Sequence, residues 1–314
     1  MSVDAVLELE WARLRADLVA AGVVVDLGAP GLYAQGPDFV RAYRAFDALL
    51  ERTFACLDAE VWQFPAVEAR PLFERTDYVA SFPQLTAALV AFTGGNPEHA
   101  ELIRVRSDGG RWEELLEPAG GLMSPAACHQ LYGVLAGTRL ERSRVFDLHG
   151  ACYRHEPSPD PLRMQAFHQH EYPYVGDAAG ALAHRDDAGA RMHDLLLGLG
   201  LAVDYQVAND PFFGRVGRVL ARNQLSAAAK YELTCPVFGA DQPPVALGSA
   251  NYHGTHFATE FSITGPDGEP AHSSCVGLGM ERVVLALFAG HGMATADWPD
   301  AVRSRLWRGP GERA

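Results

Sequence analysis

The fold is decided by Arg144-Val-Phe-Asp-Leu-His-Gly-Ala-Cys-Tyr-Arg154, then His-Glu-Pro-Ser-Pro-Asp-Pro161, then Met164-Gln-Ala-Phe-His-Gln-His-Glu-Tyr-Pro-Tyr174. The three prolines exclude a helix from the middle segment, because proline fixes φ and disfavours helical geometry in the residue before it. The outer two segments are typical of extended chain. Strands joined by so short a loop must be antiparallel. The middle of the chain is therefore predicted to be a β-hairpin.

Outward from this hairpin, the spacing of apolar residues predicts helices over residues 6–19 and 39–56. Residues 60–69 include Pro65 and alternate only in part, which favours a strand at a sheet edge or subunit interface. Alternation predicts another strand over residues 257–263. A last strand, near residues 273–277, leads directly into a helix over 283–288. The predicted fold is an antiparallel sheet flanked by helices, in the α+β class.

Composition narrows the class of protein. The 314 residues carry a net charge of −13, which argues against a broad nucleic-acid-binding surface. We expect a cytoplasmic protein, because the sequence has neither a signal peptide nor a membrane-spanning segment. Five widely spaced cysteines make a disulfide framework unexpected. We expect a helical extension over residues 1–37 and one catalytic domain over 38–314, with a helical insertion near 209–230.

Strand alternation divides the second strand of the hairpin into two faces. Phe167 and Glu171 look the same way, where the ring could stack on a nucleobase and Arg154 could pair with a phosphate. The alternative is a core phenylalanine beside a surface salt bridge. Histidines are expected to have packing or surface roles, and we assign no catalytic role to His253 or His256. The two faces are predicted to hold Gln165, Phe167, Gln169 and Glu171 on one side, and Met164, Ala166, His168 and His170 on the other.

Several motifs resemble those of class II aminoacyl-tRNA synthetases. Tyr153-Arg-His-Glu156, the proline-rich loop and Arg163-Met-Gln-Ala-Phe167 resemble motif 2, and Gly277-Leu-Gly-Met-Glu-Arg282 resembles motif 3. Residues 62–70 resemble the weaker motif 1, which builds the dimer interface in that family. Within the class, Ala229-Lys-Tyr-Glu232 and Gly248-Ser-Ala-Asn251 are most similar to seryl-tRNA synthetases. The resemblance implies a homodimer with the class II catalytic fold.

The resemblance also implies roles for single residues in binding ATP. Arg154 would hold the α-phosphate, Glu156 would orient the adenine on which Phe167 stacks, and Arg282 would lie against the γ-phosphate or adenine. Mg²⁺ would bridge the phosphates, but the expected acidic position is here Val245 or Ala246. Glu232, Ser249 and Asn251 are nearby candidates for its ligands. The remaining implied contacts are Arg163 and Ser249 to ATP, and Lys230, Glu232 and Asn251 to substrate.

A zinc site is implied by the same resemblance. Cys128, Glu171 and Cys275 match the ligands of zinc-dependent seryl-tRNA synthetases of methanogens and of their truncated relatives. Three protein ligands leave one tetrahedral position open, as in catalytic or substrate-binding zinc sites. In that family the substrate α-amino group occupies the open position. Without the resemblance, both cysteines would be assigned to the core.

The chain lacks the long coiled-coil arm with which seryl enzymes grip tRNA, since the residues before Phe39 predict one short helix. It therefore resembles the amino acid:[carrier protein] ligases, truncated homologues that load glycine or alanine onto a phosphopantetheine thiol. Serine is also left open as substrate, and no tRNA partner is expected. Three other functions stay open: a minimal tRNA synthetase, an amide ligase for a small amine, and a non-catalytic paralogue.

A basic stripe supports a carrier-protein partner. Residues 209–225 predict a helix with Asp210 as N-cap and Pro211 in its first turn. Arg215, Arg218 and Arg222 would share one face of this helix on an otherwise acidic protein. Because carrier proteins are small and acidic, we expect the stripe to dock one. The alternative is a solvated helix face.

Overall fold

The computed structural model describes residues 3–209 and 228–307, and these form a seven-stranded sheet in the order β3-β7-β8-β12-β11-β10-β9. Adjacent strands are antiparallel except β3 and β7, which are parallel, so the predicted all-antiparallel sheet is wrong at this edge. Residues 63–143 separate those two strands, a connection long enough for the crossover that parallel pairing requires. The strands are β3 (Glu60–Trp62), β7 (Arg144–Tyr153), β8 (Ala166–Gly176), β9 (Asp204–Val207), β10 (Lys230–Cys235), β11 (Val245–Gly254) and β12 (His272–Gly279).

Strands β7 and β8 form the predicted antiparallel hairpin, with Cys152 opposite Phe167 and Leu148 opposite Glu171. Strand β12 continues directly into helix α10 (Met280–His291), as predicted. Pairing of β12 with β8 places Gly277 opposite Glu171. The hairpin and the last strand therefore lie side by side in the middle of the sheet.

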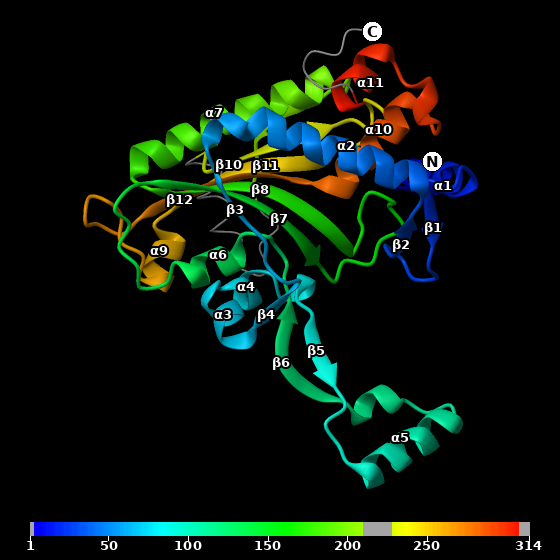
Figure 1. The fold of residues 1–314 in the computed structure, drawn as a ribbon. Helices are drawn as coiled ribbons and strands as arrows, with labels where there is room; N and C mark the ends of the chain where they lie inside the picture. Colours follow the sequence, from blue (N-terminus) through cyan, green and yellow to red (C-terminus); the bar gives the residue numbers. More distant parts are fainter. Residues whose placement is uncertain (1–2, 210–227, 308–314) are drawn as a thin grey trace.

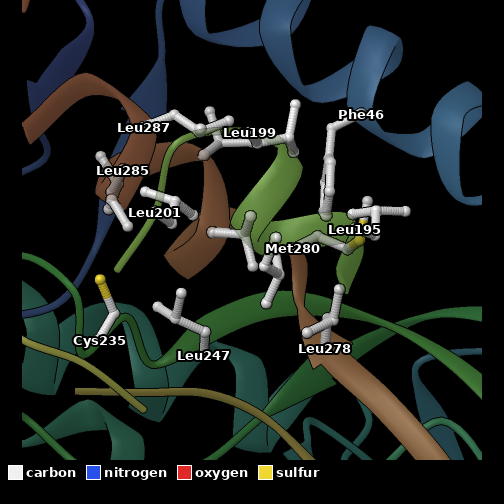
Figure 2. Packing of buried hydrophobic residues seen from close by; sticks show 14 of the residues in the cluster. Phe46, Leu195, Leu199, Leu201, Cys235, Leu247, Leu278, Met280, Leu285 and Leu287 are labelled. Atoms are coloured by element: carbon white, nitrogen blue, oxygen red, sulfur yellow. The ribbon is translucent and has the colours of Figure 1, made fainter. Parts of the chain in front are cut away.

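Helices cover one face of the sheet, which we call the helix face. Helices α2 (Pro37–Phe54), α7 (Ala178–Gly198) and α10 lie above the strands, with α11 (Asp300–Trp307) at one end (Figure 1). Helix α2 buries Phe39, Phe46 and Leu50 at helical spacing, and burial of each such side chain contributes about 1.5–3 kcal/mol. Figure 2 shows Phe46 close to Leu195 of α7. The main hydrophobic core lies between these helices and the sheet.

The N-terminal segment packs against the same core. Helix α1 (Val3–Ala20) and helix α2 confirm the two helices predicted from the first 56 residues. The extension also contains a hairpin that was not predicted, β1 (Val24–Asp26) and β2 (Tyr33–Gln35). Leu18 and Val24 are buried with the residues of α2 and α10. Residues 3–36 thus belong to the packed body.

The opposite face carries the predicted site residues, and we call it the site face. Helices α6 (His129–Val134) and α9 (His256–Phe261) cover only one end of it (Figure 1). The strand predicted over residues 257–263 is wrong, because residues 256–261 form α9. Phe257 and Phe261 are buried at helical spacing, whereas Thr259, predicted to share their face, is exposed. Phe257 stacks on Tyr132 of α6 with ring centroids 4.0 Å apart.

A projecting arm was not predicted. Strands β4 (Val67–Ala69), β6 (Glu117–Met123) and β5 (Ala88–Ala91) form a small sheet that extends away from the body and ends in α5 (Asn96–Ser107) (Figure 1). None of the residues of α5 is buried. The segment predicted as one edge strand, residues 60–69, is two short strands around Pro65. The other short helices are α3 (Arg70–Arg75), α4 (Tyr78–Ser81), η1 (Ala55–Leu57), η2 (Pro83–Leu85), η3 (Trp112–Leu115) and η4 (Thr295–Asp297).

Two further predictions concern the cysteines and the insertion. All five cysteines are free thiols, as expected. The insertion predicted near residues 209–230 extends too far, since Lys230 begins strand β10. Residues 210–227, with Arg215, Arg218 and Arg222, lie outside the described residues. Within the described ranges, no helix is both long enough and apolar enough to cross a membrane.

Candidate active site

Four strands place their site residues in one row across the site face. Glu232 of β10 lies opposite Ser249 of β11, Ser249 lies opposite Gly277 of β12, and Gly277 lies opposite Glu171 of β8. Directly opposed residues point to the same side of a sheet. Residues that are far apart in sequence are therefore neighbours here.

A second row runs parallel to the first. Lys230 lies opposite Asn251, which lies opposite Cys275. The amide of Asn251 donates a hydrogen bond to Ser249 Oγ at 2.9 Å, and Lys230 Nζ pairs with Glu232 Oε1 at 3.0 Å. Lys230 is buried at the start of strand β10. The three implied substrate contacts and Ser249 thus gather beside Cys275.

The motif 2 residues lie at the end of the hairpin. Arg154 directly follows β7, and its Nε donates to the carbonyl of Pro125 at 3.0 Å. The guanidinium carbon lies 5.4 Å from the centroid of the Phe167 ring. Phe167 is half-buried and also packs against both hydrophobic cores. Its ring therefore combines a packing role with a face turned toward Arg154.

Arg282 lies beneath the loop that joins the hairpin strands. Its guanidinium donates to the carbonyls of Leu162 at 3.0 Å and Ala246 at 2.8 Å. Burial first, and then the positive charges of Arg163 and Arg154, lower the pKa of Arg282 to about 10. Mutually repelling guanidinium groups favour an anion bound among them, since it stabilises all their charged forms.

Acidic side chains partly balance this charge. Glu156 accepts a hydrogen bond from Arg163, and Asp160 Oδ2 lies 3.8 Å from Arg163 Nε. The side chain of Arg163 is half exposed, so it can exchange these partners for a ligand. Motif 2 and motif 3 residues are thus brought together, as the sequence predicts.

Cys128, Glu171 and Cys275 form a buried cluster on the site face. Their thiol and carboxylate donor atoms all lie within 4.8 Å of one another. Glu171 Oε2 is buried without a hydrogen-bond partner. Burial raises the pKa of the Glu171 carboxyl, while a hydrogen bond with Cys275, burial and the charge of Glu171 raise the pKa of the Cys128 thiol.

These groups fit a divalent cation. Three potential anions are costly to bury together, and a bound cation removes that cost. Two thiolates and a carboxylate oxygen form a donor set that suits Zn²⁺. The three residues come from the start of α6, from β8 and from β12, so the fold rather than a local motif assembles the cluster.

Gln169 is a site residue that the sequence analysis did not single out. Its Oε1 accepts the backbone N–H of Ala127 at 3.1 Å and lies 3.3 Å from Cys152 Sγ. The hydrogen bond fixes the backbone of Ala127, which directly precedes Cys128. Alternation had already placed Gln169 between Phe167 and Glu171 on the same face, which is a signal that could have identified it.

Four histidines near the site contact neighbouring side chains. His253 Nδ1 lies 3.3 Å from the hydroxyl of Tyr132 and 3.1 Å from Ser273 Oγ, while His256 packs edge-on against Phe257. His168 and His170 point to the helix face, as alternation predicts. There His168 Nδ1 contacts Glu281 Oε1 at 2.7 Å.

Comparisons with known proteins identify relatives that match most of the chain. No family model matches the chain. Amino acid–[acyl-carrier-protein] ligase 2 of Bradyrhizobium diazoefficiens is 36% identical over 292 residues, covering 92% of this chain and 87% of that protein. Amino acid–[acyl-carrier-protein] ligase 1 of the same organism is 34% identical over 298 residues, covering 92% and 89%.

A solved structure shows the same fold. Seryl-tRNA synthetase from Methanopyrus kandleri, crystallised with tRNASec from A. aeolicus, superposes with a TM-score of 0.79 at 22% identity. The match covers 93% of this chain but only 60% of that one. The class II synthetase-like catalytic fold predicted from the motifs is confirmed.

Proposed function

The chain belongs to the family of amino acid–[acyl-carrier-protein] ligases, and from this membership we propose that it activates a small amino acid, glycine or alanine, with ATP and transfers it to a carrier protein. The observation that carries the proposal is the arrangement of the site face. Arg154, Phe167 and Arg282 lie at one end of the hairpin, and Cys128, Glu171 and Cys275 lie farther along the same face. A nucleotide subsite next to an amino acid subsite is what adenylation requires.

In the first step, a carboxylate oxygen of the amino acid attacks the α-phosphorus of ATP, and pyrophosphate leaves. Negative charge grows on the α-phosphoryl oxygens, which Arg154 stabilises from a position held by its bond to Pro125. Arg282 is held by two carbonyls, and the half-exposed Arg163 would exchange its partner Glu156 for the distal phosphates. Phe167 stacks on the adenine and Glu156 helps to orient it. Fixed geometry of these groups lowers the barrier because little reorganisation is needed.

In the amino acid subsite we assign Cys128, Glu171 and Cys275 as ligands of Zn²⁺. The bound ion would supply a Lewis-acidic position for the α-amino group of the substrate. Lys230, Glu232 and Asn251 lie on the strands beside this cluster and would contact the substrate, whereas Ser249 would contact ATP. We propose that Mg²⁺ accompanies ATP, with Glu232, Ser249 and Asn251 as candidate ligands.

In the second step, a phosphopantetheine thiol attacks the carbonyl carbon of the aminoacyl-adenylate. AMP leaves, a thioester forms and the thiol proton is released. The thiol has a pKa of about 8.5 and needs no enzyme nucleophile. The docked carrier accelerates this step by positioning the thiol next to the carbonyl carbon.

We propose that Arg215, Arg218 and Arg222 dock the acidic carrier protein. The support is the sequence spacing alone, since these residues lie outside the described residues. Reversing the three charges should slow loading of the carrier and leave pyrophosphate exchange unchanged. Equal loss of both activities would contradict docking.

We also propose a homodimer built through residues 62–70. Strand β3 forms one edge of the main sheet, and Val61 and Trp62 on it are 81% and 37% exposed. An exposed apolar sheet edge favours association with another chain. Sedimentation of the purified protein tests this, with a monomer at all concentrations as the contradicting result.

Replacing Phe167 by alanine should raise the KM for ATP by about 5- to 150-fold, because stacking on a base contributes about 1–3 kcal/mol. The KM for the amino acid should change little. Phe167→Leu is the matched control, since leucine keeps the apolar packing but lacks the aromatic face. If the leucine variant restores the KM for ATP, Phe167 acts in the core and not by stacking.

Replacing Gly277 by alanine should weaken zinc binding by about tenfold or more, as perturbed ligand positioning does elsewhere. An added Cβ would lie 2.7 Å from Glu171 Cγ and displace this side chain. Gly279→Ala is the matched control on the same strand, because its Cβ would meet Arg282 Cβ at an ordinary 3.7 Å. Competition with a chelator measures the affinity. Equal effects of the two substitutions would count against Glu171 as a ligand.

Pyrophosphate exchange with glycine, alanine and serine in turn tests the first half of the proposed function. Exchange with glycine or alanine is expected, and no exchange with any amino acid would favour a nucleotide-binding paralogue without catalysis. If exchange occurs, a carrier protein, tRNA and a small amine are then offered in turn, and the one that consumes the aminoacyl-adenylate is the acceptor.

A further inference from the structure

A second group of metal-ligating side chains lies on the helix face, behind the hairpin. His149 of β7 and His170 of β8 are directly opposite each other in the sheet. Their rings are stacked with centroids 5.4 Å apart and an interplanar angle of 5°. Because His170 directly precedes Glu171, its side chain points away from the Cys128–Glu171–Cys275 cluster.

The two rings direct the same type of nitrogen at one carboxylate. Asp47 of α2 places Oδ1 2.8 Å from His170 Nδ1 and Oδ2 3.5 Å from His149 Nδ1. One donor atom from each of the three residues lies within 4.8 Å of the others. In a tetrahedral zinc site with bonds of about 2.0–2.1 Å, donor atoms lie about 3.3 Å apart. The two observed distances, one to each oxygen of the carboxylate, lie on either side of this separation.

The outer nitrogen of each ring is held by a further partner. His170 Nε2 lies 2.8 Å from Asp147 Oδ1, and His149 Nε2 lies 2.7 Å from the hydroxyl of Tyr43. Metal-ligating histidines nearly always have their second nitrogen fixed in this way, most often by a carboxylate. Both rings are thus oriented so that Nδ1 faces Asp47.

We propose that Asp47, His149 and His170 form a second divalent metal site, which binds Zn²⁺ or a similar transition metal. Two imidazole nitrogens and one carboxylate oxygen favour such ions over Mg²⁺ and Ca²⁺, which prefer all-oxygen ligands. The side chain of His170 is 2% exposed, whereas those of Asp47 and His149 are 22% and 34% exposed. The ion can therefore enter from the side of His149, where a water can complete its coordination.

The site has a structural consequence. Asp47 belongs to α2, and the two histidines belong to the central hairpin, so the ion would tie this helix to the strands that carry Phe167 and Glu171. Without metal, the same groups form a hydrogen-bond network that also links α2 to the sheet. Measuring the metal content of the protein distinguishes the metal-bound site from the metal-free hydrogen-bond network. This inference does not rest on the proposed function.

The test is the zinc content of the purified protein after incubation with Zn²⁺ and removal of free ions. The wild type should retain one ion per chain more than His149→Gln does, which makes about two ions per chain when the Cys128–Glu171–Cys275 cluster is also occupied. His168→Gln is the matched control, because this neighbouring histidine on the same face pairs with Glu281 and should keep the wild-type metal content. Circular dichroism of each variant checks that it is folded.

Co²⁺ substitution keeps the proposal testable if His149→Gln is poorly folded. The wild type should bind one ion with thiolate-to-cobalt charge-transfer absorption and a second ion that adds only weak visible bands. In Cys128→Ser/Cys275→Ser the charge-transfer absorption should vanish while the weak bands remain. The proposal is overturned if the wild type binds no ion besides the thiolate-ligated one, or if His149→Gln and His168→Gln hold equal amounts of metal.

Discussion

Arg154→Ala is expected to lower kcat/KM for amino-acid-dependent pyrophosphate exchange by about 100- to 1,000-fold, the usual cost of removing a preorganised charge donor from a transition state. Arg154 is fixed by its bond to the Pro125 carbonyl and by the Phe167 ring, so its guanidinium is already oriented before ATP binds. The charge that it stabilises grows as the pentavalent phosphorus forms. The loss should therefore appear mainly in kcat.

Two control variants sharpen this prediction. Arg154→Lys keeps the charge but loses the planar fork and should recover only part of the activity. Arg139→Ala removes an exposed arginine near the turn at Gly268 and should leave exchange unchanged. If Arg154→Ala raises only the KM for ATP and leaves kcat intact, Arg154 binds the ground state and the assigned role is wrong.

Cys275→Ser is expected to remove the zinc ion of the Cys128–Glu171–Cys275 cluster and to lower amino acid activation by about 100-fold or more, since even indirect damage to a metal site costs 10- to 100-fold. Cys275 lies within 4.8 Å of the donor atoms of Cys128 and Glu171, and three ligands leave none to spare. ATP binding should persist, because Arg154, Phe167 and Arg282 do not contribute to this cluster. Zinc content and nucleotide binding are measured on the same preparation.

Cys235→Ser is the matched control for this substitution. Cys235 is also a buried strand cysteine, but it belongs to the main core on the helix face. The buried serine hydroxyl should lower the stability of the folded protein without changing activation of the amino acid. Full exchange activity in Cys275→Ser that has lost the zinc ion of this cluster would contradict the assigned amino acid subsite.

The hairpin and its two faces were predictable because they depend on local rules. Prolines in the 154–165 loop and alternation in the second strand are properties of neighbouring residues, and these placed Phe167 with Glu171 and opposite to His170. The resemblance of the motifs then related Arg154 and Arg282, which no local pattern connects. Their convergence in the structure agrees with that prediction.

Features decided by distant contacts were not predictable from local pattern. Residues 257–263 alternate in sequence, yet packing of Phe257 on Tyr132 favours a helix there. Parallel pairing of β3 with β7 depends on the path of the whole intervening segment. Asp47 meets His149 and His170 only because α2 packs over the hairpin, so the second metal-ligating group had no sequence signal.

The most direct measurement of the central claim is the intact mass of a carrier protein after incubation with this protein, ATP and glycine or alanine. The phosphopantetheinylated carrier should gain one aminoacyl group, and the carrier without its prosthetic thiol should gain none. A phosphopantetheinylated carrier incubated with Arg154→Ala should gain the group at least about 100-fold more slowly. An unchanged carrier mass, in a reaction where the aminoacyl-adenylate forms and is consumed by tRNA or a small amine, would contradict the account.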